Sequence, residues 1–192
     1  FNPEKFAKSN TFEGDFSQKL FSNTLGSNTS LGSKASSENW KYLVRGSNSF
    51  HSDYKIADGN RVANTRFNES DLKTGIGYSN SIFSSVLRYN FNKLDLGIPE
   101  NGIAEQTSSS TPEYPKQAVV NHLLSLNSTL FFNTSKLDID LGFISNNRSE
   151  FEDSDVANLK MKLNTLNYNL KYFLMSPSGI HAHSYYIQSY HH

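Results

Sequence analysis

Histidines and closely spaced aspartates are the residues of this chain whose types could carry chemistry. The candidates are His51, His122, His181, His183, His191, His192, Asp138 and Asp140. Four of these histidines lie at the C-terminal end, where imidazoles could bind zinc, and the two aspartates have the spacing of a carboxylate pair on one strand face. We expect instead a disordered histidine-rich tail and a polar strand stripe. The sequence therefore predicts no catalytic residue, no metal site, no cofactor and no enzyme activity.

The polar stretches between apolar segments hold a second set of candidates. Residues 57–60 (Ala-Asp-Gly-Asn) predict a turn, and Asp53 and Asp58 supply too few carboxylates for a calcium loop. Four other side chains have types that suit contact with a chelate or a peptide: Tyr54, Arg61, Arg66 and Tyr114. We expect these four to be solvated loop residues, so the ligand-binding site remains unassigned.

The composition excludes several classes of protein. Lysine plus arginine equals aspartate plus glutamate at 18 each, so no basic surplus points to a nucleic-acid partner. Only 36% of the 192 residues are apolar, whereas 13% are aromatic, which is poor in aliphatics for a soluble core but too aromatic for disorder. The absence of cysteine excludes a disulfide scaffold, cysteine-based zinc sites and thiol chemistry. A start at Phe1 without a signal peptide suggests an internal fragment.

Alternation of apolar and polar residues predicts the elements that would position these side chains. The alternating segments are 12–22, 29–35, 40–50, 71–78, 82–92, 121–132, 137–143 and 159–172. They predict about eight strands, long enough to be tilted membrane strands. Residues 159–163 alternate out of phase with residues 166–172, which predicts a bulge or the point where the strand enters a bilayer.

The links between the segments alternate in length from residue 35 onward. Short links are residues 36–39, 79–81 and 133–136, and long polar links are about 52–66, 95–119 and 146–158. An outer-membrane barrel has short periplasmic turns and longer external loops. The pattern predicts an all-β, antiparallel up-and-down meander of about eight strands, which would be a partial transmembrane β-barrel in the form of an open curved sheet.

Alternation alone does not decide which face of this sheet points inward. In a membrane barrel the apolar face contacts lipid and the charged face lines a wet lumen. The alternative is a soluble extracellular β-barrel binding module: a lipocalin-like barrel, which has its apolar face inside, or an adhesin. The charged face and the sorted links favour the membrane barrel. Aromatic residues near the strand ends fit an interfacial girdle or the plain strand preference of aromatics: Trp40, Tyr78, Phe83, Phe132 and Tyr172.

Six stretches of the chain carry a resemblance to a known family. They are residues 64–78 (NTRFNESDLKTGIGY), 87–92 (LRYNFN), 96–100 (LGIPE), 121–127 (NHLLSLN), 147–152 (NRSEFE) and 21–26 (FSNTLG). Together they resemble the early barrel strands of TonB-dependent outer-membrane receptors of the Bacteroidetes type. The resemblance extends over residues 1–174, so we expect a partial barrel there and a divergent C-terminal tail at residues 175–192.

The resemblance implies a function and a set of partners. Such receptors have a 22-stranded barrel and an N-terminal plug, and they import iron chelates, such as siderophores, or other scarce nutrients with energy from TonB. The implied partners are outer-membrane lipid, the TonB complex through a plug that this chain lacks, and a small nutrient ligand such as a metal chelate. The implied location is the outer membrane of a Gram-negative cell. A fragment without the plug would not itself transport.

Overall fold

The computed structural model describes residues 3–99, 103–105, 107–176 and 179–191. The regular elements of this part of the chain are all strands, and it contains no helix that could cross a membrane. The strands are β1 (Thr11–Phe21), β2 (Gly26–Ser36), β3 (Trp40–His51), β4 (Arg61–Val62), β5 (Phe67–Ser79), β6 (Phe83–Gly97), β7 (Ile103–Ala104), β8 (Lys116–Phe131), β9 (Ser135–Phe151), β10 (Leu159–Ser176) and β11 (Gly179–His191).

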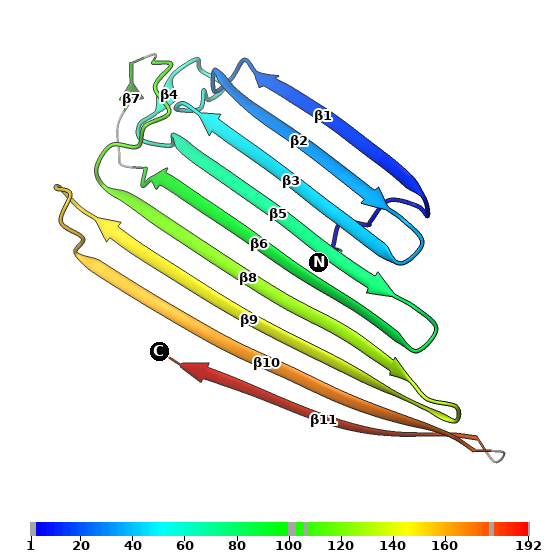
Figure 1. The fold of residues 1–192 in the computed structure, drawn as a ribbon. Coiled ribbons are helices and arrows are strands. Elements are labelled where there is room, and N and C mark those ends of the chain that lie inside the picture. Colours follow the sequence, from blue (N-terminus) through cyan, green and yellow to red (C-terminus); the bar gives the residue numbers. More distant parts are fainter. Residues whose placement is uncertain (1–2, 100–102, 106, 177–178, 192) are drawn as a thin grey trace.

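One antiparallel sheet contains all strands except β4 and β7 (Figure 1). Its order is β1-β2-β3-β5-β6-β8-β9-β10-β11, so each strand pairs with the next along the chain. The eight strands from β1 to β10 in this sheet confirm the predicted antiparallel meander. β1 and β11 form the two edges, and the sheet is therefore open. The strands β4 and β7 pair with each other, and each belongs to one of two long links.

The C-terminal segment differs from the expected disordered tail. Its backbone forms β11, which pairs with β10 from Leu174↔His181 to Asn164↔His191. The prediction of an unstructured tail is therefore wrong for Gly179–His191. Among the tail histidines, only the exposed side chain of His183 is described. The alternative weighed for the tail, a metal site at His181, His183, His191 and His192, thus lies largely outside the described side chains.

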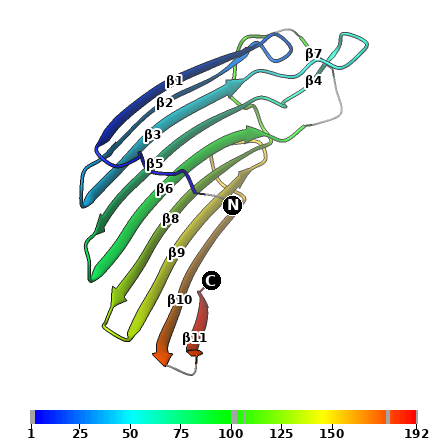
Figure 2. The same cartoon turned by 90° about the vertical axis from the view of Figure 1, so that its right-hand side faces the viewer.

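The polar face of the sheet is concave and the apolar face is convex. Figure 2 shows the curvature of the sheet, with the N-terminal segment before β1 on its concave side. Glu4 of that segment forms ion pairs with Arg45 and Lys34, and Arg88 donates a hydrogen bond to its carbonyl oxygen. These three cations belong to the polar set of alternating side chains, so that set points into the concavity.

The phase break in the last long segment is not a bulge. β10 pairs with β9 in unbroken register from Leu159↔Glu150 to Leu174↔Ser135. The alternation instead reverses along a regular strand: Lys160 and Lys162 share the convex face with Leu166. The convex face of β10 therefore changes from polar to apolar side chains along the strand.

An apolar band crosses the convex face obliquely. In β1 it runs from Phe12 to Leu20. When the residue pairings are followed from strand to strand across the sheet, Phe12 is in line with Tyr168 of β10 and Leu20 is in line with Lys160. In β10, however, the apolar residues run from Leu166 to Leu174. Both ends of the band are thus displaced by six residues towards the short turns, and its length stays at nine residues. Over the seven strand intervals from β1 to β10, this displacement corresponds to a slope of about 30°.

Candidate functional site

The two long links, between β3 and β5 and between β6 and β8, pack together at one end of the sheet (Figure 1). We call residues 52–66 and the described part of 98–115 the loop cluster. The Asn64 side chain joins the two links, because its Nδ2 donates to the carbonyl oxygens of Ile98, Glu113 and Pro115 at 3.2, 2.9 and 2.8 Å. A Cβ at Gly97 would lie 2.1 Å from Asn64 Oδ1, so only glycine allows this close approach.

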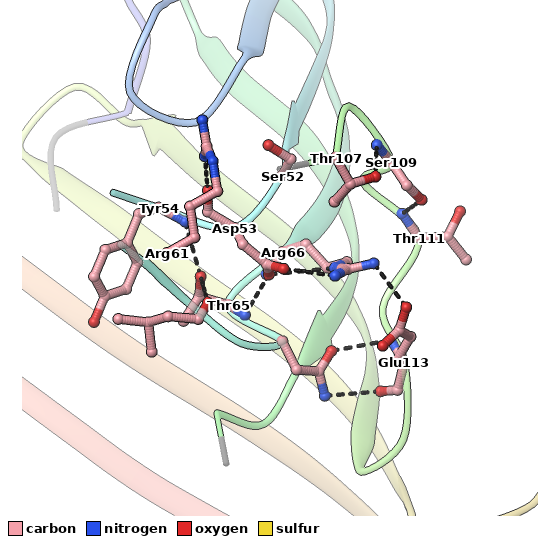
Figure 3. A network of polar contacts seen from close by, with 12 residues as sticks. Ser52, Asp53, Tyr54, Arg61, Thr65, Arg66, Thr107, Ser109, Thr111 and Glu113 are labelled. Carbon is pink, nitrogen blue, oxygen red and sulfur yellow. Dashed lines mark hydrogen bonds and ion pairs between the residues drawn. The ribbon is translucent and has the colours of Figure 1, made fainter. Parts of the chain in front are cut away.

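A buried ion pair between Asp53 and Arg66 holds the loop cluster together (Figure 3). Asp53 is 0% exposed, and its carboxylate accepts hydrogen bonds from Arg66 Nε at 3.2 Å and Nη2 at 2.5 Å, and from the amides of Thr65 and Arg66 at 2.8 and 3.1 Å. Arg66 Nη1 reaches Glu113 of the other link at 3.0 Å. Burial alone would raise the pKa of Asp53, but the hydrogen bonds and charge of Arg66 and the two amides lower it below its ordinary value.

The four loop residues predicted to be solvated divide into two pairs. Arg61 and Arg66 are buried, so the prediction is wrong for both. Arg61 donates to the carbonyl oxygens of Asn23 and Asp53, whereas the Arg66 side chain donates to the carboxylates of Asp53 and Glu113. Tyr54 is exposed. Tyr114 donates from its hydroxyl to Asp155, and Lys116 Nζ lies 4.2 Å from the centroid of its ring.

The predicted turn at residues 57–60 is confirmed. Gly59 has a φ of 91°, a conformation that favours glycine, and the Asp58 carboxylate accepts a hydrogen bond from the Asn60 amide at 2.9 Å. Nothing in the loop sequence indicated the partnership of Asp53 with Arg66 or the role of Asn64. Those contacts join residues 13 to 51 positions apart, and alternation carries no information about them.

Rows of polar side chains cross the concave wall, which we define as the polar face of β1–β10. Asn92 donates to Asp71 at 3.0 Å, Asn121 donates to Asn92 at 3.1 Å, and Asn146 donates to Asn121 at 2.5 Å. The row thus links β5, β6, β8 and β9 through side chains alone. Such a surface meets its hydrogen-bonding needs internally and with water, as the wall of a hydrated space would.

The aspartates singled out by their spacing belong to this wall. Asp140 accepts hydrogen bonds from Asn127 and Asn169, and Asp138 accepts hydrogen bonds from Thr129 and Lys136. Each carboxylate has its own set of partners, as expected for a polar stripe.

The two histidines outside the tail have hydrogen-bond partners. His51 lies 2.7 Å from both Thr24 Oγ1 and Asn28 Oδ1, and His122 Nδ1 lies 2.8 Å from the Tyr89 hydroxyl. Within the described part of the chain, no group of three or more histidine, aspartate, glutamate or cysteine side chains could hold a metal ion.

The N-terminal segment, residues 3–10, is fastened to the concave wall by Arg45. Arg45 donates from Nε and Nη2 to the Glu4 carboxylate, both at 2.9 Å. It also donates to both carboxylate oxygens of Asp15, at 2.6 and 2.7 Å, and to Ser30 Oγ at 3.0 Å. The guanidinium therefore uses its N–H groups fully. Sequence alternation placed Arg45 on the polar face but did not indicate this contact.

Replacing Glu4 by glutamine is expected to release the N-terminal segment. Hydrogen bonds from Arg45, together with its charge and that of Lys34, outweigh burial and lower the pKa of Glu4 below its ordinary value of 4.5. The contact is therefore complete above about pH 4.5 and is lost as the pH falls through the lowered pKa. Glu4→Gln should weaken docking by about 1.5–3 kcal/mol at neutral pH.

Tryptic cleavage after Lys5 and Lys8 measures this release. Cleavage should be faster in Glu4→Gln than in the unaltered chain at pH 8. Glu38→Gln, an exposed position in the turn between β2 and β3, is the control and should leave the rate unchanged. Equal cleavage rates in Glu4→Gln and Glu38→Gln would show that Arg45 does not hold the segment.

The comparisons with known proteins identify no family. No protein-family model matches the chain, and no curated protein matches it. The molecule itself presents three distinct surfaces. They are a polar, concave wall that carries a docked segment, an oblique apolar band on the convex side, and a loop cluster at one rim.

Proposed function

We propose that this chain is a segment of an outer-membrane β-barrel, from a TonB-dependent receptor that imports iron chelates or other scarce nutrients. The observation that carries the proposal is the oblique apolar band. A flat hydrocarbon layer crossed by tilted strands produces a band of constant length that shifts steadily from strand to strand. Strands of outer-membrane barrels tilt by about 35–45°, which is close to the slope of about 30° obtained from the register.

The height of the band agrees with the same proposal. Nine residues are joined by eight steps of about 3.3 Å, and at an inclination of about 30° these steps span about 23 Å. The outward apolar band of outer-membrane barrels is about 25 Å tall. On the side of the long links, β10 presents Lys160 and Lys162 on the convex face, which suits the part of a strand that extends beyond the hydrocarbon.

The direction of curvature supports a membrane barrel over the soluble alternative. A lipocalin-like barrel encloses its ligand within an apolar interior, and its outer face is polar. Here the concave side holds the asparagine row and the ion pairs of Arg45. The concave wall would line a wet lumen in the proposed receptor. A plug outside this chain would provide the link to TonB, and the nutrient ligand would pass the same wall.

Aromatic residues beside the short turns fit an interfacial girdle. Trp40 and Tyr78 have ring centroids 4.8 Å apart, and Tyr78 and Phe83 have ring centroids 6.4 Å apart. All three lie on the convex face at its short-turn end. In the proposed orientation this end faces the periplasm.

Trp40 provides a direct test, because it is the only tryptophan of the chain and is 42% exposed on the convex face. In vesicles that contain lipids brominated near the headgroup end of the acyl chain, its fluorescence should be quenched. The matched control is Trp40→Phe combined with Lys41→Trp, which moves the fluorophore to the concave face and should reduce quenching. A chain that stays in the aqueous phase, with Trp40 unquenched, would favour the soluble module.

A further inference from the structure

Four cations of the concave wall gather beneath the N-terminal segment: Lys34 on β2, Arg45 on β3, Lys73 on β5 and Arg88 on β6. Arg45 lies directly opposite Lys73 in the β3–β5 register. Arg88 is a diagonal neighbour of Lys73, because Lys73 pairs with Asn90. Like charges at directly opposed positions destabilise a sheet, so this arrangement requires anions nearby.

Two of these cations receive carboxylates. The ion pairs are Arg45 with Glu4 and Asp15, at 2.9 and 2.6 Å, and Lys34 with Glu4 and Glu13, at 3.7 and 3.8 Å. The negative charges that reach the cluster are therefore concentrated on its β2–β3 side.

Lys73 and Arg88, on the β5–β6 side, lack such partners. Within the described residues, no carboxylate lies within 4.0 Å of either charged group. Asp71, two residues from Lys73 on the same face, accepts hydrogen bonds from Ser47 and Asn92. Arg88 donates one hydrogen bond, from Nη1 to the Glu4 carbonyl oxygen at 3.0 Å.

A cavity of about 50 Å³ is lined by both cations, by Pro3 and Glu4 of the N-terminal segment, and by Leu43, Thr74 and Asn90. Phe6 covers Arg88 with its ring centroid 4.5 Å from the guanidinium carbon. Gly75 leaves room for that ring, because a Cβ there would lie 3.1 Å from Phe6 Cζ. A cavity of this size holds about three or four water molecules, so it can admit a carboxylate or a phosphate group.

We propose that this cavity binds a small oxyanion, a phosphate or carboxylate group, between Lys73 and Arg88. The bound anion would offset the like-charge repulsion, and guanidinium and ammonium groups both form strong charge-assisted hydrogen bonds with such oxygens. Glu4 also lines the cavity, but the charge of its carboxylate is already offset by Arg45 and Lys34. The site does not depend on membrane insertion and goes beyond the proposed function.

Calorimetric titration of the full chain in detergent micelles at low salt tests the site, with inorganic phosphate in one arm and acetate in the other. We expect saturable binding of at least one of them at a single site. Lys73→Gln and Arg88→Gln should each weaken it tenfold or more. Lys19 lies on the concave face of β1 and outside the cavity. Lys19→Gln is therefore the matched control and should leave the affinity unchanged.

The titrations with phosphate and with acetate also identify the chemical class of the bound anion. Binding of phosphate alone assigns a phosphoryl group to the site, and binding of acetate alone assigns a carboxylate. The proposal is overturned if neither anion binds, or if binding persists equally in Lys73→Gln and Lys19→Gln. Circular dichroism checks the fold of each variant, and Lys73→Gln decides the result if Arg88→Gln does not fold. Because no bilayer is present, failure here leaves the Trp40 quenching result unaffected.

Discussion

Replacing Asp53 by alanine is expected to open the loop cluster at a cost of about 3–5 kcal/mol, the usual penalty for removing one partner of a buried ion pair. Arg66 is 6% exposed, so its charge would remain buried with only Glu113 as a partner. The amides of Thr65 and Arg66 would also lose their acceptor. Hydrogen exchange of these two amides measures the change, because both should exchange much faster in the variant.

Two further variants separate the ion pair from a general effect of substitution. Asp58→Ala removes an exposed carboxylate whose hydrogen-bond donors, among the described residues, both belong to Asn60, and it should leave exchange at Thr65 unchanged. Asp53→Ala combined with Arg66→Met removes both charges, and it should recover part of the lost stability. Protection in Asp53→Ala equal to that of the unaltered chain would contradict the role given to this pair.

The same pair predicts a dependence on pH. The folded-state pKa of Asp53 lies below its ordinary value of 3.8. Its contribution to stability is therefore complete well above pH 3.8 and is lost as the pH falls through the lowered pKa. Acidification through this pKa should therefore weaken the protection of loop-cluster amides from hydrogen exchange in the unaltered chain. The loss of protection on acidification should be smaller in Asp53→Ala.

Replacing Leu141 by arginine is expected to weaken folding into lipid vesicles by about 2–4 kcal/mol, the cost of a charge on the lipid face near the bilayer midplane. Leu141 lies on the convex face of β9, between Leu126 and Tyr168 of the neighbouring strands, and is 41% exposed. In the proposed orientation, the arginine would leave water for hydrocarbon. The measurement is the denaturant-dependent equilibrium between the unfolded and the vesicle-inserted chain.

Gly142→Arg is the matched control, one residue along the same strand. Its side chain would enter the concave face between Ser125 and Asn167. A Cβ at Gly142 would have only one neighbour within 4 Å, Asn167 Cβ at 3.9 Å. This variant should insert as well as the unaltered chain. Equal costs for Leu141→Arg and Gly142→Arg would show that the convex face does not contact hydrocarbon, which would remove the main support for the membrane proposal.

In the loop cluster, local sequence patterns predicted the turn but not the buried arginines. The turn around Gly59 followed from residue types that act locally, and it was predicted correctly. Arg61 and Arg66 were expected to be solvated, because loops usually lie at the surface. Their partners, Asn23, Asp53 and Glu113, are brought to them only when the two links and the turn between β1 and β2 fold over the same rim of the sheet. A side chain that serves such a junction has no local pattern that distinguishes it from a solvated one.

The sequence by itself determined the eight strands from β1 to β10 of the main sheet, their antiparallel order and the division of their side chains into two faces, because alternation and link length act over neighbouring residues. It also placed Asp138 and Asp140 in a polar stripe. It did not indicate β4, β7 or β11. Only the tertiary structure decided which face is concave, since curvature depends on the twist and stagger of many strands together. The slope of the apolar band was likewise set by the register of eight strands. For the same reason, the meeting of Glu4 with Arg45 and the charge imbalance at Lys73 and Arg88 became visible only in the folded sheet.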